Sequence, residues 1–206
     1  MIELKGLTKR FEEKVLFSDF NLVIQDGEFV IFSGPSGCGK TTLLNMIGAI
    51  EKIEQGSIVV DGMDIKVKKN HLNYFRTKIG FLFQNFALVD NKTVKENLKM
   101  IRKDCQTNLT MEQALETVGL QDKLNKKVYT LSGGEQQRVA LARLILKKCD
   151  IILADEPTGS LDKQNAEMVL RILKQLNKEG KTIVLVTHDE EIKKQGSKVV
   201  NLCENC

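Results

Sequence analysis

The order of apolar and polar positions predicts a parallel sheet covered by helices on both faces. Four short segments are almost continuously apolar, which is typical of strands buried on both sides: 29–32, 79–83, 151–154 and 182–187. Between the last two, apolar residues recur at i, i+3, i+4 and i+7, on one face of a helix: Val169, Ile172, Leu173 and Leu176. Buried strands that alternate with helices predict an α/β fold with a mostly parallel sheet.

Two further parts are added to this core. The beginning of the chain favours β-strands at 2–7 and 15–24, and a hairpin is predicted at 57–65 around the turn Asp61-Gly62. In the middle, two pairs have the spacing of capping boxes: Thr93 with Glu96, and Thr110 with Gln113. Amphipathic segments follow at 97–102 and 114–118. We therefore expect one domain over 1–206, with an antiparallel β subdomain at its start and a helical insertion at about 85–130.

Composition and charge place the chain among ordinary globular proteins. Of 206 residues, 42% are hydrophobic and 28% are charged, which excludes a disordered chain and allows a sizeable core. The net charge of +4 is small and dispersed, so no nucleic-acid partner is expected. No apolar run approaches the roughly 20 residues of a membrane span. The five cysteines are scattered and odd in number, so we expect a reduced, cytoplasmic protein.

A glycine-rich loop after the first buried strand carries the most specific chemistry. Its sequence matches the P-loop pattern G-x-x-x-x-G-K-[ST] over Gly34-Pro35-Ser36-Gly37-Cys38-Gly39-Lys40-Thr41. Between a strand and a helix, such a loop turns its N–H groups towards phosphate oxygens, which disfavours a chance glycine loop. We expect Lys40 to contact the β- and γ-phosphates of ATP and the Thr41 hydroxyl to bind Mg²⁺. The other expected ATP-binding positions of the loop are Ser36, Gly37, Cys38, Gly39 and Thr42.

Two carboxylates follow the apolar segment 151–154. Ligands of open α/β sheets bind at the carboxyl ends of strands, so Asp155 and Glu156 lie at the predicted ligand edge. We expect Asp155 to hold Mg²⁺ through water, and Glu156 to act as general base on the attacking water or to orient it. Alone, the pair would be interpreted as a solvated acidic turn. A P-loop in the same chain favours the catalytic interpretation.

A second anion-binding pattern occurs over Leu131-Ser132-Gly133-Gly134-Glu135-Gln136-Gln137-Arg138. Ser132 and Glu135 have capping-box spacing, so a helix is predicted to begin here. A serine and two glycines at a helix start offer free N–H groups and a favourable dipole to a phosphate. The plainer interpretation is a well-capped helix. One ATP per chain does not require two phosphate sites, whereas two chains that face each other would use both.

Together these motifs resemble those of the nucleotide-binding subunits of ABC ATPases, over about residues 1–200. The shared order is the P-loop, Gln84 at a strand end, the signature Ser132-Gly133-Gly134, the acidic strand 151–156, Ser160-Leu161-Asp162, and His188 after the last core strand. The resemblance implies a P-loop NTPase core that hydrolyses ATP and serves a separate transmembrane permease subunit. It also implies a head-to-tail homodimer enclosing two MgATP, each between one P-loop and the partner's signature.

The resemblance assigns roles to four further positions. Gln84 would touch Mg²⁺ or the attacking water, and the following residues 85–90 would meet the permease. His188 would contact the γ-phosphate as a switch, although a lone histidine is more often structural. Asp162 would make a dimer contact. Phe11 occupies the place of an aromatic residue that stacks on adenine, and the alternative is an ordinary core phenylalanine.

Within the family, residues 134–143 and 155–162 resemble the branch of lipoprotein-release, macrolide-efflux and cell-division ATPases, and ATPases proposed to export antimicrobial peptides. This implies a protein held by its permease on the inner face of the cell membrane, exporting a peptide, lipoprotein or drug-like substrate. The alternative is a mechanotransmission ATPase that controls an extracytoplasmic enzyme and transports nothing. A soluble ABC ATPase acting on ribosomes or DNA ranks last, because such chains carry two ATPase cores or a long coiled coil.

Two cysteine patterns remain open. Cys38 lies in the P-loop at a predicted helix start, where it is either a small residue that fits or an unusually reactive thiol. Cys203 and Cys206 are interpreted as part of a frayed tail, because two ligands are too few for structural zinc.

Overall fold

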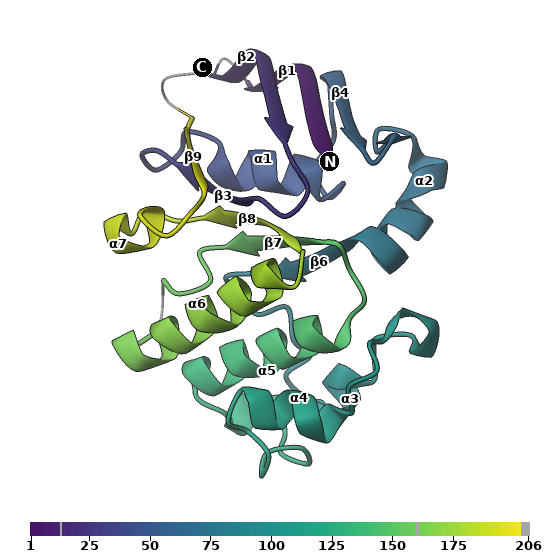
Figure 1. Cartoon of the computed structure of the whole chain (residues 1–206), viewed down its shortest axis with the longest axis vertical. Helices are drawn as coiled ribbons and strands as arrows, with labels where there is room; N and C mark the ends of the chain where they lie inside the picture. Colours follow the sequence, from purple (N-terminus) through teal and green to yellow (C-terminus); the bar gives the residue numbers. More distant parts are fainter. Residues whose placement is uncertain (13, 160, 203–206) are drawn as a thin grey trace.

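A five-stranded parallel sheet forms the centre of the protein (Figure 1). The structure, a computed structural model, describes residues 1–12, 14–159 and 161–202. The strands stand in the order β6 (Ile79–Leu82), β7 (Ile151–Asp155), β8 (Thr182–Val186), β3 (Phe29–Ser33) and β9 (Lys198–Asn201). All four neighbouring pairs are parallel. The prediction of an α/β fold with a parallel sheet is therefore confirmed.

A smaller antiparallel sheet stands beside it, as the beginning of the chain predicted. Its order is β2 (Lys14–Ile24), β1 (Ile2–Phe11), β4 (Gln55–Val60) and β5 (Met63–Asp64). The turn Asp61-Gly62 joins β4 to β5, and both residues have positive φ, as a tight two-residue hairpin requires. In Figure 1 the helix α1 (Lys40–Ile47) lies between this sheet and the parallel one.

Alternate residues of the buried strand β3 enter two separate apolar cores. Val30 and Phe32 belong to the core between the two sheets, together with the apolar side chains of α1. Phe29 and Ile31 belong to the opposite core, which helices α5 (Gly133–Leu146) and α6 (Lys163–Lys178) cover. The strand is apolar throughout because both of its faces are buried. The helical face predicted on α6 is buried in this second core, with Val169, Ile172, Leu173 and Leu176.

The insertion between β6 and α5 contains shorter helices than the sequence predicted. Both capping boxes form, and they begin α3 (Val94–Leu98) and α4 (Met111–Thr117). The expected helix over 97–102 is wrong, because α3 ends at Leu98. The remainder consists of turns, including single 3₁₀ turns at Lys103–Cys105 and Val128–Thr130. The buried side-chain amide of Asn97 holds one of these turns in place. It accepts a hydrogen bond from the N–H of Val89 and donates to the carbonyls of Val89 and Thr93, which holds the loop at Val89 against α3.

Three elements were not predicted. Helix α2 (Lys68–Asn73) continues into a π-helical turn at Tyr74–Lys78, and a short helix α7 (Glu190–Lys193) follows β8. The edge strand β9 adds to the sheet, so the expectation that β8 is the last core strand is wrong. In β9 only Val200 is buried, which left too little apolar pattern to predict a strand. Residues Ser160, Cys203 and Cys206 lie outside the described residues, and the interpretation of the tail with them.

One further observation concerns membrane spans. Across the described ranges, none of the helices has both the length and the apolar character needed to cross a bilayer.

Candidate nucleotide-binding site

Three loops meet at the carboxyl edge of the parallel sheet. Strand β8 lies between β7 and β3, and Val186 of β8 pairs with both Asp155 and Phe32. The loops that follow these three strands therefore leave the sheet at one level. The first is the glycine-rich loop 34–39, the second contains Glu156 and the third contains His188. These residues lie far apart in the sequence. This is the edge at which ligands of open α/β sheets bind.

The glycine-rich loop wraps back onto the start of α1 through left-handed backbone at two glycines. Gly37 has φ 77° and Gly39, the residue before the helix, has φ 95°. A Cβ at Gly39 would lie 2.7 Å from Cζ of Phe17, so a side chain is excluded by space as well as by conformation. The Lys14 ammonium donates to the carbonyl of Gly37 at 2.9 Å and braces the loop. Lys14 was not identified from the sequence.

Lys40 turns its side chain back over the loop. Its ammonium donates to the carbonyls of Gly34 at 2.8 Å and Pro35 at 2.9 Å, and lies 3.9 Å from Sγ of Cys38. A positive charge is thus held at a helix N-terminus, where the dipole and free N–H groups already favour an anion. Ser36 is exposed, and Cys38 is half-buried against the core between the sheets.

A cavity of about 320 Å³ opens beside this loop. Its lining includes five of the predicted ATP-binding positions of the loop and the predicted adenine-stacking residue: Gly37, Gly39, Lys40, Thr41, Thr42 and Phe11, with Lys14 and Leu16. Phe11 is 48% exposed, so its interpretation as an ordinary core residue is wrong. The Lys9 ammonium lies 4.9 Å from the centroid of the Phe11 ring. The cavity thus joins a phosphate-binding loop to an exposed aromatic face.

Two of the three residues expected to hold a metal, Thr41 and Asp155, are in contact. The Thr41 hydroxyl donates to Oδ1 of Asp155 at 3.1 Å, and Asp155 is only 8% exposed. Burial raises the pKa of Asp155, and the charge of Glu156 adds to this, whereas Thr41 and Lys40 oppose it. A divalent cation would relieve the cost of this buried charge, and hydroxyl and carboxylate oxygens suit Mg²⁺. The pair therefore fits the predicted metal.

Gln84 is the predicted ligand that the structure leaves apart. It is exposed in the turn two residues after β6, at the same edge of the sheet, because Leu82 pairs with Ala154. Within the described residues it makes no hydrogen bond to Thr41, Asp155 or Glu156.

Glu156 and His188 form a pair at the outer side of this edge. Nδ1 of His188 lies 2.9 Å from Oε1 of Glu156, and the His188 side chain is 75% exposed while that of Glu156 is 15% exposed. Glu156 has φ 43°, a left-handed conformation that is uncommon outside glycine. Its N–H donates to the carbonyl of Val186, which anchors the carboxylate to β8.

The signature forms a helix start of its own. Ser132 and Glu135 make both hydrogen bonds of the capping box, so the predicted start of α5 is confirmed. Ser132 and Gly133 are exposed, and a Cβ at Gly133 would meet open space. None of the three signature residues lines the P-loop cavity. Asp162 caps α6 and accepts from the backbone and side chain of Asn165, which lower its pKa.

Comparison with known proteins decides the family. The family model described as ABC transporter matches residues 17–159, more than half of the chain. The chain belongs to the ABC transporter family. It is 39% identical to the ABC transporter ATP-binding protein YvrO of Bacillus subtilis, over 97% of this chain and 92% of that protein. It is 40% identical to the macrolide export ATP-binding/permease protein MacB of Campylobacter jejuni, over 98% of this chain but only 33% of MacB.

Solved cassettes of the family share the fold. The ABC transporter cassette MJ0796, from Methanocaldococcus jannaschii, was solved as a dimer. It superposes with a TM-score of 0.88 at 37% identity, over 98% of this chain and 94% of that one. A second dimeric structure of MJ0796 is a post-hydrolysis state bound to ADP and Pi, with a TM-score of 0.85 at 36% identity and the same coverage. The protein is thus an ABC ATPase, the ATP-binding subunit of a transporter.

Proposed function

We propose that two copies of this ABC ATPase close head to tail on two MgATP and drive a separate permease. One observation carries the proposal: the chain holds two helix starts suited to binding an anion, and Ser132 and Gly133 of the signature are exposed but line no part of the P-loop cavity. A second copy that supplied Ser132, Gly133 and Gly134 to this P-loop would use both. MJ0796, at 37% identity, is dimeric.

The residues at the sheet edge divide the work of hydrolysis. Lys40 and the loop N–H groups bind the phosphates, and Phe11 stacks on the adenine. Thr41 and Asp155 hold Mg²⁺, with Gln84 joining them on closure; the ion, when bound, neutralises phosphate charge. Glu156 takes a proton from the attacking water on its carboxylate. His188, 2.9 Å from that carboxylate, orients it and contacts the γ-phosphate.

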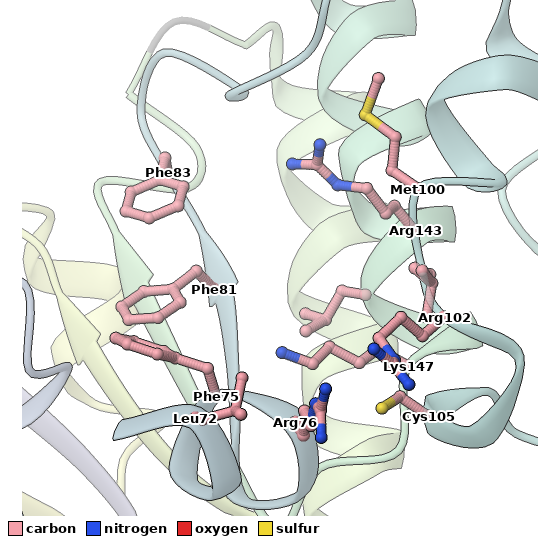
Figure 2. A pocket seen from close by; sticks show the side chains of 12 residues that line it. Leu72, Phe75, Arg76, Phe81, Phe83, Met100, Arg102, Cys105, Arg143 and Lys147 are labelled. Atoms are coloured by element: carbon pink, nitrogen blue, oxygen red, sulfur yellow. The ribbon is translucent and has the colours of Figure 1, made fainter. Parts of the chain in front are cut away.

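A second groove, which shares no lining residue with the P-loop cavity, supports permease binding. Figure 2 shows three aromatic side chains on one wall, Phe75, Phe81 and Phe83, and the cations Arg102, Arg143 and Lys147 on the other. The cavity has a volume of about 430 Å³, and none of the described residues that line it is a carboxylate. Arg102 is paired with Asp104 at 3.1 Å, which leaves Arg143 and Lys147 without a carboxylate partner among the described residues. Arg143 also donates to the carbonyls of Phe86 and Ala87, in the stretch after Gln84 that the family resemblance assigns to the permease. We infer an occupant with apolar side chains and a carboxylate, from a permease loop.

The name of one relative, MacB, supports export as the direction. MacB is named a macrolide export protein, so this subunit would sit on the inner face of the membrane and export a peptide, lipoprotein or drug-like substrate. Control of an extracytoplasmic enzyme without transport would use the same ATPase chemistry. Uptake or release of labelled substrate by vesicles that contain the complex separates the two.

The decisive experiment is a pull-down from native membranes with the Glu156→Gln variant held in MgATP. A multi-span permease that co-purifies with two copies of the ATPase is the expected result. Lys40→Ala, which removes phosphate binding, and Ser132→Arg, which blocks closure, are the matched controls and should lose ATP-dependent dimers. Recovery of ribosomes or nucleic acid with no membrane protein would overturn the transporter assignment.

A further inference from the structure

The helix that begins with the signature is tied directly to the segment that carries Glu156. Nε2 of Gln137, on α5, donates to the main-chain carbonyl of Pro157 at 2.8 Å. Both residues are buried, and Gln137 is only 1% exposed. Oε1 of Gln137 has no hydrogen-bond partner among the described residues. A glutamine is an unusual choice for a core position unless its hydrogen bond has a purpose there.

The bond acts on the peptide next to the proposed base. Glu156 is held in a left-handed conformation, φ 43°, which persists only where the surrounding structure fixes it. On one side its N–H donates to Val186 of β8. On the other side Pro157 has no N–H to donate. There the Gly159 N–H donates to the Glu156 carbonyl, and Gln137 donates to the Pro157 carbonyl, which adds an anchor from a different helix.

A second contact joins the same two parts. Gly134 of the signature packs against the start of α6, where a Cβ would lie 3.3 Å from Nδ2 of Asn165 and 3.9 Å from Cδ2 of Leu161. The first turns of α5 thus contact both Pro157 and the start of α6. Gln137 lies one turn beyond Gly133 and Gly134 on that helix.

We propose that Gln137 is a positioning residue for Glu156. Through the Pro157 carbonyl it fixes the backbone that aims the Glu156 carboxylate at the attacking water. Because the signature ahead of it binds the partner's ATP, closure on that ATP would reach Glu156 through the first turns of α5. The inference rests on the proposed base role of Glu156 and on the head-to-tail dimer.

The first test replaces the amide with a side chain of equal length that cannot donate. Gln137→Met should lower kcat for ATP hydrolysis by about 10- to 100-fold, because small misalignments of catalytic groups cost about that much. KM for ATP and ATP-dependent dimer formation should stay near the wild-type values. Gln137→Leu serves as a second variant if the first does not fold. Tyr74→Phe is the matched control: it also removes one buried hydrogen bond of 2.8 Å to a main-chain carbonyl, that of Ile47.

The second test is a double-mutant cycle. If Gln137 acts through Glu156, Gln137→Met should not further lower the residual single-turnover rate of Glu156→Gln. An equal loss in both backgrounds, or a kcat of Gln137→Met equal to that of Tyr74→Phe, would overturn the proposal. Full turnover by Glu156→Gln alone would instead overturn the base assignment, so the two failures are distinguishable.

Discussion

Nδ1 of His188 donates to the carboxylate of Glu156 across 2.9 Å, although the two residues are 32 positions apart in the chain. They reach each other because β7 and β8 are adjacent and parallel and end at the same level. His188 is the exposed member and covers the carboxylate from the solvent side. An exposed side chain that touches the proposed base can also contact a nucleotide held between two copies.

Replacing Glu156 and replacing His188 should lower kcat to different extents. Glu156→Gln keeps the shape and the contact with His188 but removes the proton acceptor, so kcat should fall by about 10²- to 10⁴-fold while ATP binding is retained. His188→Ala should also lower kcat, whereas His188→Gln, which keeps a polar contact, should lower it less. Steady-state ATPase assays and equilibrium binding of ATP measure both. Unchanged turnover in Glu156→Gln would remove it as the base.

The buried carboxylate of Asp155 should reduce stability in the absence of nucleotide. Burial raises the pKa of Asp155 above its unfolded value, so the folded state binds a proton more readily than the unfolded state. This group's contribution to stability is therefore greatest below the unfolded pKa and is lost as the pH rises through the raised folded pKa. Asp155→Asn has no ionisable group at this position, so it removes the loss of stability at higher pH. Its amide oxygen can still accept from the Thr41 hydroxyl.

The expected result is a higher Tm for Asp155→Asn than for wild type near pH 7, by about 2–4 °C for each kcal/mol. The difference should shrink towards zero as the pH falls below about 3.9, the usual pKa of an unfolded Asp, because the carboxyl then becomes protonated in both states. With MgATP the order should reverse, because ligand binding stabilises the wild type more. Thermal unfolding at several pH values, with and without MgATP, checks the prediction. A Tm for Asp155→Asn below that of wild type at neutral pH would contradict it.

Phe11 should contribute to ATP affinity through its ring face alone. Stacking of a base on an aromatic side chain is worth about 1–3 kcal/mol, so Phe11→Ala should raise KM for ATP by about 5- to 150-fold. Phe11→Tyr should stay close to wild type because it keeps the ring. The Lys9 ammonium lies over the same ring. The KM of Phe11→Ala should also be compared for ATP and GTP. Equal KM values for Phe11→Ala and wild type would show that adenine binds elsewhere.

The site could be predicted where chemistry requires a fixed local pattern. The P-loop, the capping box at Ser132 and the carboxylates after β7 each follow from residues close together in the chain, and the structure has these elements in the expected places. The cavity at Phe11 required the family resemblance, because nothing local marks an exposed phenylalanine as a ligand residue.

What could not be predicted depends on contacts between distant segments. Gln137 looks like any polar residue of a helix, and only the fold brings it to Pro157, 20 positions away. Helix α3 ends at Leu98 and does not continue through the amphipathic segment 97–102. The bond between the Asn97 side chain and the backbone of Val89 is also a contact that periodicity does not encode. Strand β9 forms because β3 offers it a free edge, although its own pattern is weak.

The thiol of Cys38 should report on occupancy of the P-loop. Its Sγ lies 3.9 Å from the Lys40 ammonium, and the residue is half-buried within the loop that would enclose the phosphates. Alkylation adds bulk inside that loop, so N-ethylmaleimide should abolish ATP binding, and saturating MgATP should slow the reaction. Cys105 and Cys149 are buried and should react only on unfolding. A Cys38→Ser variant should resist inactivation under the same conditions; inactivation at the wild-type rate would assign the effect to another cysteine.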